Sequence, residues 1–380
     1  MLVYSVLYIS VIFQAFISDF LNIKRNPKKV MFWAIYVFAV LIMGFRYKVG
    51  MDTYNYMDAY QNIPTLDKID YLNIFTYAYQ PFYLLFTSFC KTFISNEFYP
   101  VQLIQAIVVN WIIFRFIYQK SSKPFIALFF YFFIYFLYFN TEVMKESLAV
   151  VFFILNYDNF VARKWKKYYI LVLVSCMFHL SALSLLFLPF LSNLKINTSF
   201  CVFLVIFVFL WSIFDQYLGY LDRFEFFSGK LKGYVEFAES GKRSDAWKLL
   251  ILIQSFLLPL GGFLIAKFIL KSSIALRYEP LMAMLIILGA GVVINPLIFS
   301  RLTNYYTPIY ALLLSEVFIS LFYKTRFKIF IISYLLAVFT IYLYDFWSYS
   351  KYVIWIPYHS VLDPIEEKDR DYFRYKNFGR

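Results

Sequence analysis

The sequence predicts an all-α protein that crosses a membrane many times. Its 380 residues are 62% hydrophobic and 24% aromatic, whereas only 16% are charged. Soluble domains are about half apolar and about a quarter charged. A chain of this length cannot bury so much apolar surface in water, so its solvent is lipid. The composition excludes a disordered chain, a disulfide-stapled secreted protein and a soluble enzyme with one membrane anchor.

Apolar runs along the chain approach the ~20 residues that a helix needs to cross about 30 Å of hydrocarbon. Ten such runs predict full transmembrane helices, near 2–21, 29–45, 99–118, 124–140, 143–161, 199–218, 247–270, 280–299, 302–323 and 327–346. Cys90, Cys176 and Cys201 lie in apolar stretches. They are expected to be small core residues rather than a disulfide or a metal site.

Two further apolar stretches are expected to be interrupted or re-entrant. Residues 81–94 begin with a proline and contain Lys91, and residues 168–191 carry His179 at their centre and Pro189 near their end. Non-helical backbone at membrane depth persists only where protein buries it or a wet cavity lines it. The two stretches therefore point to a functional cavity. The alternative is twelve ordinary helices.

The net charge of +13 is concentrated in short links between the apolar runs. These links carry basic residues and no acid: Lys24, Arg25, Lys28, Lys29, Lys120, Lys123, Arg163, Lys164, Lys166, Lys167, Lys195, Lys271, Arg277, Lys324, Arg326 and Lys328. Such clusters mark the cytoplasmic loops of multi-pass membrane proteins, so a nucleic-acid partner is not expected. Every cluster lies inside if both odd stretches are re-entrant. The charge rule therefore favours about ten full spans plus two interrupted segments.

On this topology the chain is a single membrane-embedded domain over residues 1–380. Three polar regions face the outside: a first loop at 46–80, a second loop at 219–246 and a C-terminal tail at 347–380. We expect the extracytoplasmic loops to form the active-site cavity.

The first polar constellation follows the second predicted span. Arg46 emerges where that span ends, Gly50 allows a turn, and Asp52 comes next among tyrosines. An arginine fork binds phosphate through two hydrogen bonds, and a carboxylate can take a proton from a sugar hydroxyl. The alternative is that Arg46 and Asp52 only cap and neutralise an interfacial turn.

A second constellation joins two predicted helices and contains Asn140, Glu142, Lys145 and Glu146. The last three stand at i, i+3 and i+4, which predicts one shared helix face. Polar groups this close to the bilayer usually pair with each other or with a ligand. Structural pairing alone is the alternative.

Other candidates are a histidine and an arginine. His179, two residues before Ser181, could act as a general acid or base or as a hydrogen-bond donor. The alternative is a buried histidine that only forms a hydrogen bond to a carbonyl. Arg301 and Tyr305 are one helical turn apart at the start of a predicted span. The chain has no nucleotide-binding loop, dinucleotide fingerprint, HExxH or CxxC motif, so no cofactor is expected. No aspartate pair or histidine cluster argues for a metal site, and metal dependence stays open.

Four segments in a fixed order carry a family resemblance. They are GFRYKVGMDTYNY at 44–56, FHLSAL at 178–183, SRLTNYY at 300–306 and IPYHSVL at 356–362. Together they resemble the EpsG-like family of bacterial polysaccharide polymerases, which are related in role to the Wzy O-antigen polymerases. Where the family tends to carry an Arg-Gln pair, this chain has Lys145 and Glu146.

The resemblance implies a multi-pass enzyme of the bacterial plasma membrane, with its active site facing the periplasm or exterior. It would join repeat units carried on undecaprenyl pyrophosphate into O-antigen, capsule or exopolysaccharide. The sugar–pyrophosphate bond supplies the energy, so no cofactor is needed. The implied partners are the lipid-linked donor and acceptor, the bilayer and a chain-length regulator protein.

The resemblance also suggests roles for the candidate residues. Arg46, Arg301 and Lys145 would stabilise the leaving pyrophosphate, and Asp52 or His179 would be the general base. The expected sugar platforms are Tyr47, Tyr54, Tyr305 and Tyr358. Arg46 is expected at an exposed helix end, where its replacement by alanine opens no cavity.

Three other functions remain open at this point. A lipid-linked oligosaccharide flippase would have a central cationic cavity, and a membrane O-acyltransferase would place a histidine and arginines on the inner side. Another lipid-linked glycosyltransferase or ligase is the third. The side of the membrane that holds His179 and Arg46 distinguishes these functions.

Overall fold

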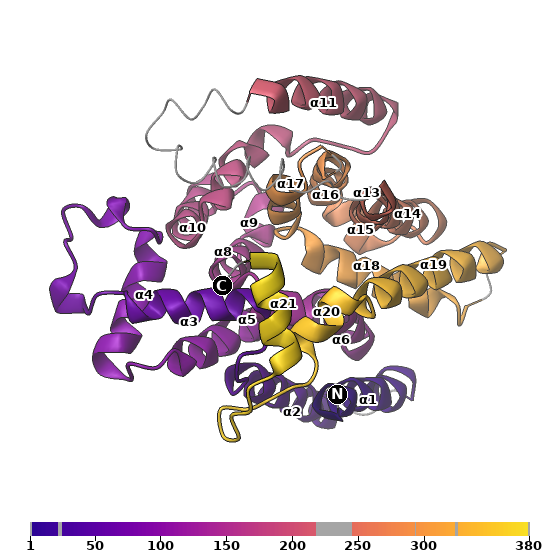
Figure 1. Cartoon of the computed structure of the whole chain (residues 1–380). Coiled ribbons are helices and arrows are strands. Elements are labelled where there is room, and N and C mark those ends of the chain that lie inside the picture. Colours follow the sequence, from indigo (N-terminus) through magenta and orange to yellow (C-terminus); the bar gives the residue numbers. More distant parts are fainter. Residues whose placement is uncertain (1, 22–24, 218–244, 293, 324–325, 379–380) are drawn as a thin grey trace. The chain divides into compact units, whose positions relative to one another are not determined.

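The computed structural model describes the chain except residues 1, 22–24, 218–244, 293, 324–325 and 379–380 (Figure 1). The described residues are helical, and their only β-type pairs are isolated bridges. This confirms the predicted all-α class. Contacts within the chain define two compact units. Unit 1 comprises Met1–Leu186 and Leu343–Arg380, and unit 2 comprises Phe187–Tyr342.

Unit 1 holds most of the predicted polar constellations. Its elements are α1 (Leu2–Gln14), η1 (Ala15–Phe20), α2 (Arg25–Gly44), α3 (Met51–Gln61), η2 (Leu66–Lys68), η3 (Ile74–Thr76), α4 (Pro81–Phe93), α5 (Tyr99–Lys120), α6 (Pro124–Tyr131), η4 (Phe132–Phe136), α7 (Leu137–Thr141), α8 (Met144–Ile154), α9 (Tyr157–Val161), α10 (Trp165–Phe178), α20 (Tyr349–Trp355) and α21 (Lys368–Phe378).

Unit 2 contains a second set of apolar helices. They are α11 (Thr198–Tyr217), α13 (Asp245–Leu252), η7 (Ile253–Leu257), α14 (Leu258–Leu264), η8 (Ile265–Ile269), α15 (Ser273–Arg277), α16 (Glu279–Gly291), α17 (Pro296–Thr303) and α18 (Thr307–Ser320). Two elements cross the boundary between the units, η5 (Leu180–Leu191) and α19 (Lys328–Phe346).

Six described helices are long and apolar enough to cross a membrane. They are Leu2–Phe20, Asn26–Gly44, Tyr99–Lys120, Pro124–Thr141, Trp247–Ile269 and Lys328–Phe346. Each coincides with a predicted span, so the multi-pass character is confirmed. The predicted count of ten full spans, or of twelve, is not confirmed.

Two of the other predicted spans are divided, and prolines or polar residues explain where. The run at 280–299 ends as α16 at Gly291, and α17 begins at Pro296. Asn295 caps α17 by accepting a hydrogen bond from the Ile298 N–H (3.2 Å), and proline favours the first helical position. The run at 143–161 is divided into α8 and α9 by a turn at Leu155 and Asn156.

The stretch at 168–191 is interrupted at His179, as predicted. α10 ends at Phe178, His179 is extended, and the 3₁₀ helix η5 follows. The Tyr168 hydroxyl, near the start of α10, donates a hydrogen bond to the Leu185 carbonyl (2.7 Å). The chain therefore turns back at His179 and runs beside α10. The other odd stretch is α4, with only 13 residues.

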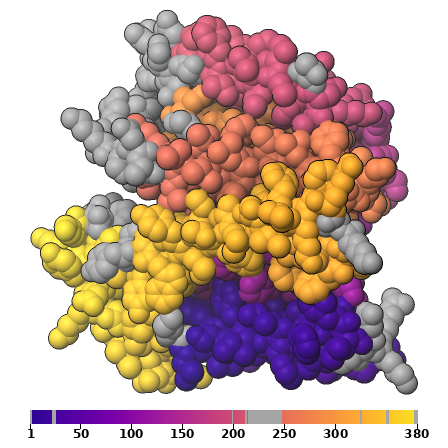
Figure 2. Space-filling view, turned by 90° about the vertical axis from the view of Figure 1, so that its right-hand side faces the viewer, coloured from indigo at the N-terminus to yellow at the C-terminus, as the bar shows by residue number. Residues whose placement is uncertain are grey.

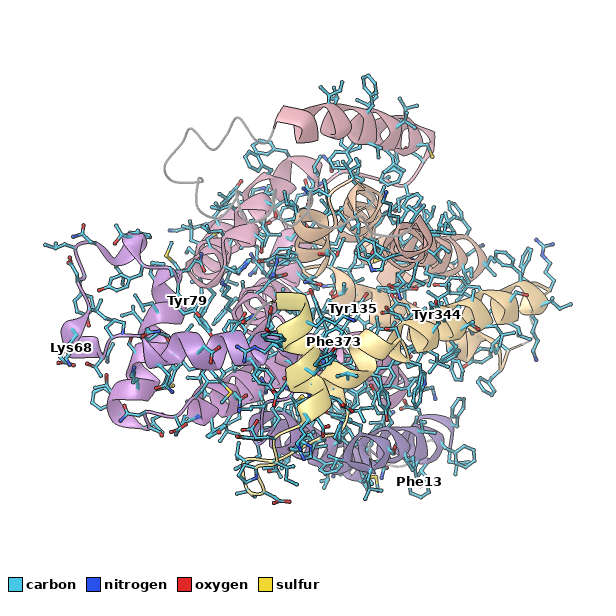
Figure 3. All side chains as sticks on the ribbon, in the orientation of Figure 1. Phe13, Lys68, Tyr79, Tyr135, Tyr344 and Phe373 are labelled. Atoms are coloured by element: carbon cyan, nitrogen blue, oxygen red, sulfur yellow. The ribbon has the colours of Figure 1, made fainter. Side chains whose placement is uncertain are left out.

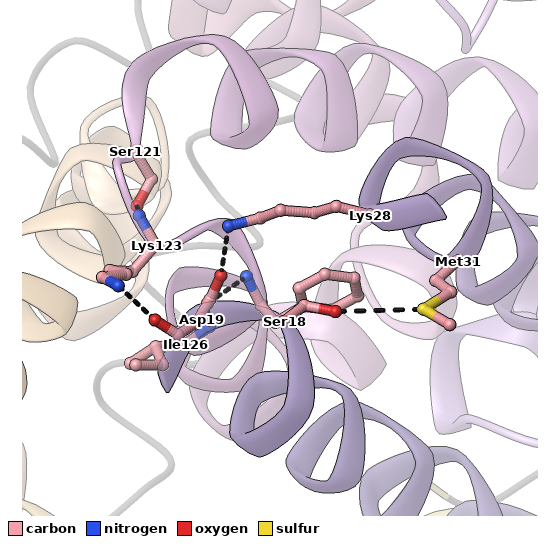
Figure 4. A network of polar contacts seen from close by, with 8 residues as sticks. Ser18, Asp19, Lys28, Met31, Ser121, Lys123 and Ile126 are labelled. Atoms are coloured by element: carbon pink, nitrogen blue, oxygen red, sulfur yellow. Dashed lines mark hydrogen bonds and ion pairs between the residues drawn. The ribbon is translucent and has the colours of Figure 1, made fainter. Parts of the chain in front are cut away.

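The basic clusters of unit 1 meet at one end of the unit, called the basic end here. Buried Asp19 forms an ion pair with Lys28 (2.6 Å), and the Asp19 carbonyl accepts a hydrogen bond from Lys123 (Figure 4). The Asp19 carboxylate also accepts the N–H groups of Phe125 and Ile126 (2.9 and 3.0 Å), at the start of α6. One carboxylate thus holds two basic links together.

A third basic link reaches the same end through α9. Lys120, at the end of α5, forms an ion pair with Asp158 (2.7 Å). The cluster at 163–167 follows Asp158 within one or two turns. The re-entrant topology requires this gathering. If α4 does not cross the membrane, α5 starts at the opposite end of the unit and brings Lys120 to the basic end.

The C-terminal tail returns to unit 1. Figure 2 shows the C-terminal surface directly beside the N-terminal surface, and the rings of Tyr358 and Tyr4 meet edge to face with centroids 5.8 Å apart. The loop predicted at 219–246 lies almost entirely outside the described residues. Cys90 and Cys176 are buried as predicted, whereas Cys201 is exposed.

Candidate active site

The site is built at the end of unit 1 opposite to the basic end, where α2 ends. The chain segment after α2 pairs with the tail: the Tyr47 N–H donates to the His359 carbonyl and the Val361 N–H donates to the Phe45 carbonyl, both at 2.8 Å. Two segments that carry the family resemblance, more than 300 residues apart, are therefore adjacent. Sequence analysis had described them separately.

Arg370 holds this pairing together. Its side chain is fully buried and donates hydrogen bonds to three carbonyls, those of Val353 (3.0 Å), Lys48 (2.7 Å) and Pro357 (2.6 Å). A guanidinium presents several donors in a planar fork, so one side chain can join three backbone segments. Sequence analysis missed this residue, since nothing near Arg370 marks it as buried.

Glu142 caps α3 from a distant part of the chain. Its two carboxylate oxygens accept the N–H groups of Met51 and Asp52, both at 3.1 Å. Gly50 precedes the helix at a φ of 97°, and a Cβ there would lie 2.5 Å from Thr141. Only glycine fits this left-handed, close approach. The negative charge of Glu142 at the N-terminus of α3 also interacts favourably with the helix dipole.

The predicted helix face of the second constellation is wrong in one respect. α7 ends at Thr141 and α8 begins at Met144, so Glu142 and Val143 form the break between them. Glu142 is therefore not on the same helix as Lys145. The break turns its carboxylate towards α3, and sequence analysis had no means of placing that distant partner.

Four side chains form what we call the junction cluster: Asp52, Tyr79, Glu142 and Lys145. The Lys145 ammonium lies over the Tyr79 ring, 5.1 Å from its centroid. Burial and the Asp52 charge raise the pKa of Tyr79 to about 12, and they raise the pKa of Glu142 to about 7. Asp52, Glu142 and Lys145 are each half-buried. Asp52 therefore lies near both Glu142 and Tyr79, Lys145 lies over the Tyr79 ring, and each of these groups is partly exposed at this end of the unit.

Arg46 is placed differently from the expectation. Its side chain is fully buried, and its guanidinium donates hydrogen bonds to the Met43 carbonyl and to the Met144 sulfur (3.2 Å). Burial lowers the pKa of Arg46 to about 10, while Tyr4 and Glu142 act in the opposite direction. The expectation of an exposed helix end is wrong, because the tail and α8 cover this position.

The expected sugar platforms are largely engaged within the protein. Tyr54 is buried and its hydroxyl donates to Asp371 (2.9 Å), and the Tyr358 hydroxyl donates to a carbonyl at the end of α2 (3.0 Å). Tyr47 is half-buried and donates to Glu366 (2.7 Å). α21 and the segment before it therefore cover the face that the tyrosines were expected to expose.

His179 and Arg301 belong to other elements than the four residues of the junction cluster. His179 is buried, and its Nδ1 is 2.6 Å from the Ser181 hydroxyl at the turn between α10 and η5. Arg301 lies on the short helix α17 of unit 2, and Tyr305 is fully buried in the same unit. Within the described residues, no three His, Cys, Asp or Glu side chains are arranged to hold a metal ion.

The junction cluster can carry out proton transfer next to a stabilised negative charge. A carboxylate accepts a proton from a hydroxyl, while a lysine cation stabilises a leaving anion. Perturbed pKa values in a polar cluster of a membrane protein mark functional sites. Of the cluster, sequence analysis assigned roles only to Asp52 and Lys145.

One of three comparisons with known proteins identifies a family. A search of curated proteins found no match, and neither did a search of solved structures. The model of the EpsG family matches residues 29–360, which is most of the chain and includes every member of the junction cluster. That family is Wzy-type and polymerase-like. The chain therefore belongs to the EpsG family of membrane proteins with a polysaccharide-polymerase-like function.

Proposed function

We propose that the chain joins sugar repeat units carried on a lipid pyrophosphate, undecaprenyl pyrophosphate in bacteria, into O-antigen, capsule or exopolysaccharide. The observation that carries this proposal is the junction cluster. It combines two carboxyl groups with the Lys145 cation at the end of α2 opposite to the basic end. The family membership supplies the reaction class. No nucleotide is needed, because the sugar–pyrophosphate bond is already activated.

The reaction is a displacement at the anomeric carbon of the donor. The acceptor hydroxyl gives its proton to Asp52, and its oxygen forms a bond to that carbon. The bond from the carbon to the pyrophosphate oxygen breaks, and the lipid pyrophosphate leaves with the electron pair. Lys145 stabilises the negative charge that develops on the leaving group. Glu142 positions Asp52 by capping α3.

Asp52 is preferred to His179 as the general base. Asp52 is half-buried near Tyr79 and Glu142, and its carboxylate accepts one long hydrogen bond from Asn55 (3.3 Å), whereas His179 is buried and its Nδ1 is 2.6 Å from the Ser181 hydroxyl. Arg301, in unit 2, remains a proposed second ligand of the donor pyrophosphate. Arg46 is given a different role, since its buried guanidinium holds the end of α2 against α8.

The distribution of charge supports an external site. The basic links at 24–29, 120–123 and 163–167 gather at the basic end, and such clusters face the cytoplasm. α2 has 20 residues, which is about 30 Å at 1.5 Å per residue. The junction cluster at its other end therefore belongs at the outer face of the plasma membrane. A flippase or an inner-face acyltransferase fits this arrangement less well.

Surface glycan from a deletion strain tests the proposal. The strain should make single repeat units without polymer, and the wild-type gene should restore the ladder on a gel. Lys145→Met should fail to restore it, whereas Lys120→Met, at the basic end, should succeed. Full-length polymer in the deletion strain would overturn the function. Polymer from Lys145→Met at wild-type protein level would overturn the site.

A further inference from the structure

The helix α4 exposes apolar side chains on one face and buries polar side chains on the other, which is the reverse of a helix that faces water. Phe82, Phe89 and Phe93 lie on its exposed face, 39%, 47% and 67% exposed. The opposite face buries polar side chains, including Thr87 and Ser88. Positions i, i+7 and i+11 lie on one side of a helix, so the phenylalanines form a continuous stripe.

The loop before α4 continues this apolar surface. Tyr71, Leu72 and Phe75 are 56%, 96% and 69% exposed. Their exposure is built in, since the Asp70 carboxylate accepts the Leu72 N–H (3.1 Å) and the Asn73 side-chain amide (2.7 Å). A turn that is hydrogen-bonded in this way holds the leucine outward.

Hydrogen bonds join the loop, α4 and α3 into one element. The Leu66 N–H donates to the Thr92 hydroxyl (2.9 Å), so the loop starts against the end of α4. The Lys91 ammonium donates to the carbonyls of Tyr60 (3.0 Å), Gln61 (2.8 Å) and Ile63 (2.8 Å) at the end of α3. A cation at a helix C-terminus is favourable for the helix dipole.

This element packs against the ends of two apolar helices. The ring of Phe82 contacts that of Phe178 at the end of α10 (5.7 Å between centroids). The ring of Tyr60 contacts that of Phe98 (5.5 Å), immediately before the membrane-spanning helix α5. The exposed stripe of α4 therefore lies next to the ends of α10 and α5. Figure 3 shows Lys68 at the rim of the ribbon and Tyr79 further in.

We infer that α4 and residues 66–77 form a membrane shelf that inserts its aromatic face into the outer leaflet of the bilayer. The partner is lipid hydrocarbon at the interface, which an amphipathic element enters by about 5–10 Å with its aromatic residues. The α4 part of the shelf begins at Pro81, two residues after Tyr79 of the junction cluster. Residues 66–77, predicted as part of the first extracytoplasmic loop, thus form with α4 the part of the site that faces the lipid side.

Spin labels test the shelf directly. In a chain whose three cysteines are replaced, a label at Leu72→Cys or Phe75→Cys in proteoliposomes should relax with oxygen and lose its response to a water-soluble nickel chelate. The matched control is Asp67→Cys on the same loop, which should respond to nickel. All three positions are exposed, so the substitutions open no cavity.

Two results would overturn the shelf. One is a nickel response at positions 72 and 75 as strong as that at position 67, which would put the loop in water. The other is dipolar broadening between labels at 72, which would mean that a second copy covers the face. Because the measurement needs no turnover, the shelf and the proposed polymerase function succeed or fail independently.

Discussion

Asp19 and Glu142 do the same local task at the two ends of unit 1, with opposite surroundings. Each accepts two successive backbone N–H groups at the start of a helix from another part of the chain, at 2.9 and 3.0 Å for Asp19 and 3.1 Å for Glu142. Asp19 is neutralised by Lys28. Glu142 instead lies near the like charge of Asp52, and burial together with this charge raises the pKa of Glu142.

The comparison distinguishes a carboxylate with a structural role from one that can take part in chemistry. A carboxylate that caps a helix and meets a cation is satisfied, and it holds basic links together. A carboxylate that caps a helix and meets another carboxylate is held in an unfavourable electrostatic state, which the surrounding structure must stabilise. Such strained pairs are typical of sites that move protons.

The largest expected effect is the loss of Asp52 as a base. Asp52→Asn should lower polymerisation by roughly 10²–10⁴-fold, the usual contribution of a general base, at unchanged protein level. Asp58→Asn is the matched control, since Asp58 lies on the same helix, exposed and paired with Arg374. An in vitro assay with lipid-linked repeat units gives the rates. Equal rates for the two variants would remove Asp52 from the chemistry.

Asp19→Ala should act on folding instead. It leaves Lys28 without its partner and uncaps α6, and breaking a buried ion pair costs about 3–5 kcal/mol. Asp158→Ala is the control, because its pair with Lys120 is half exposed and is worth about 1 kcal/mol or less. Thermal unfolding of the detergent-purified protein measures both. A stable Asp19→Ala protein would contradict the role assigned to the basic end.

Arg46 tests whether a buried cation beside the junction cluster serves structure or substrate. Arg46→Ala should lower stability by on the order of 2–3 kcal/mol, because it leaves a cavity. Arg46→Met, which fills the space with an unbranched chain, should recover abundance and most of the polymer. Gel analysis of glycan at matched protein level decides the question. If the Arg46→Met protein is abundant but inactive, Arg46 binds the donor pyrophosphate, as the sequence analysis predicted.

The smallest effect expected is on pH dependence. The pKa of Glu142 is raised to about 7, so its carboxylate is ionised above this pH and protonated below it. Protonation weakens the cap that positions Asp52, and the rate should fall several-fold as pH drops below about 7. Glu142→Gln carries no titrating group and should lack this limb. A wild-type profile that is flat between pH 6 and 8 would argue against the coupling.

Sequence analysis predicted the fold class because composition and hydropathy act on every residue. It also located the interruption at His179 and the gathering of basic links, since both follow from chain-wide rules on polar groups in lipid. It could not divide the run at 280–299 correctly, although Asn295 and Pro296 together form a recognisable helix start. The helix count depends on such local breaks.

The site was predictable only in part, because its contacts are long-range. Asp52 and Lys145 stood out as charges near apolar runs, and Glu142 was noticed without a role. Nothing in the sequence indicates that Glu142 caps a helix 90 residues earlier or that Arg370 is buried. For the same reason Arg46 was taken to be exposed. Its burial depends on Met144 and on a tail more than 300 residues away.

The grip of Arg370 on three carbonyls has a consequence for biosynthesis. A ribosome releases α2 and α3 into the membrane long before it reaches residue 370, so the turn after α2 must wait for more than 300 further residues. Until then Lys48 and Tyr47 lack the partners that they have in the finished protein. The nascent protein therefore lacks this assembled turn until Arg370 has been made, and a chain that stops before Arg370 carries its membrane helices without an assembled site.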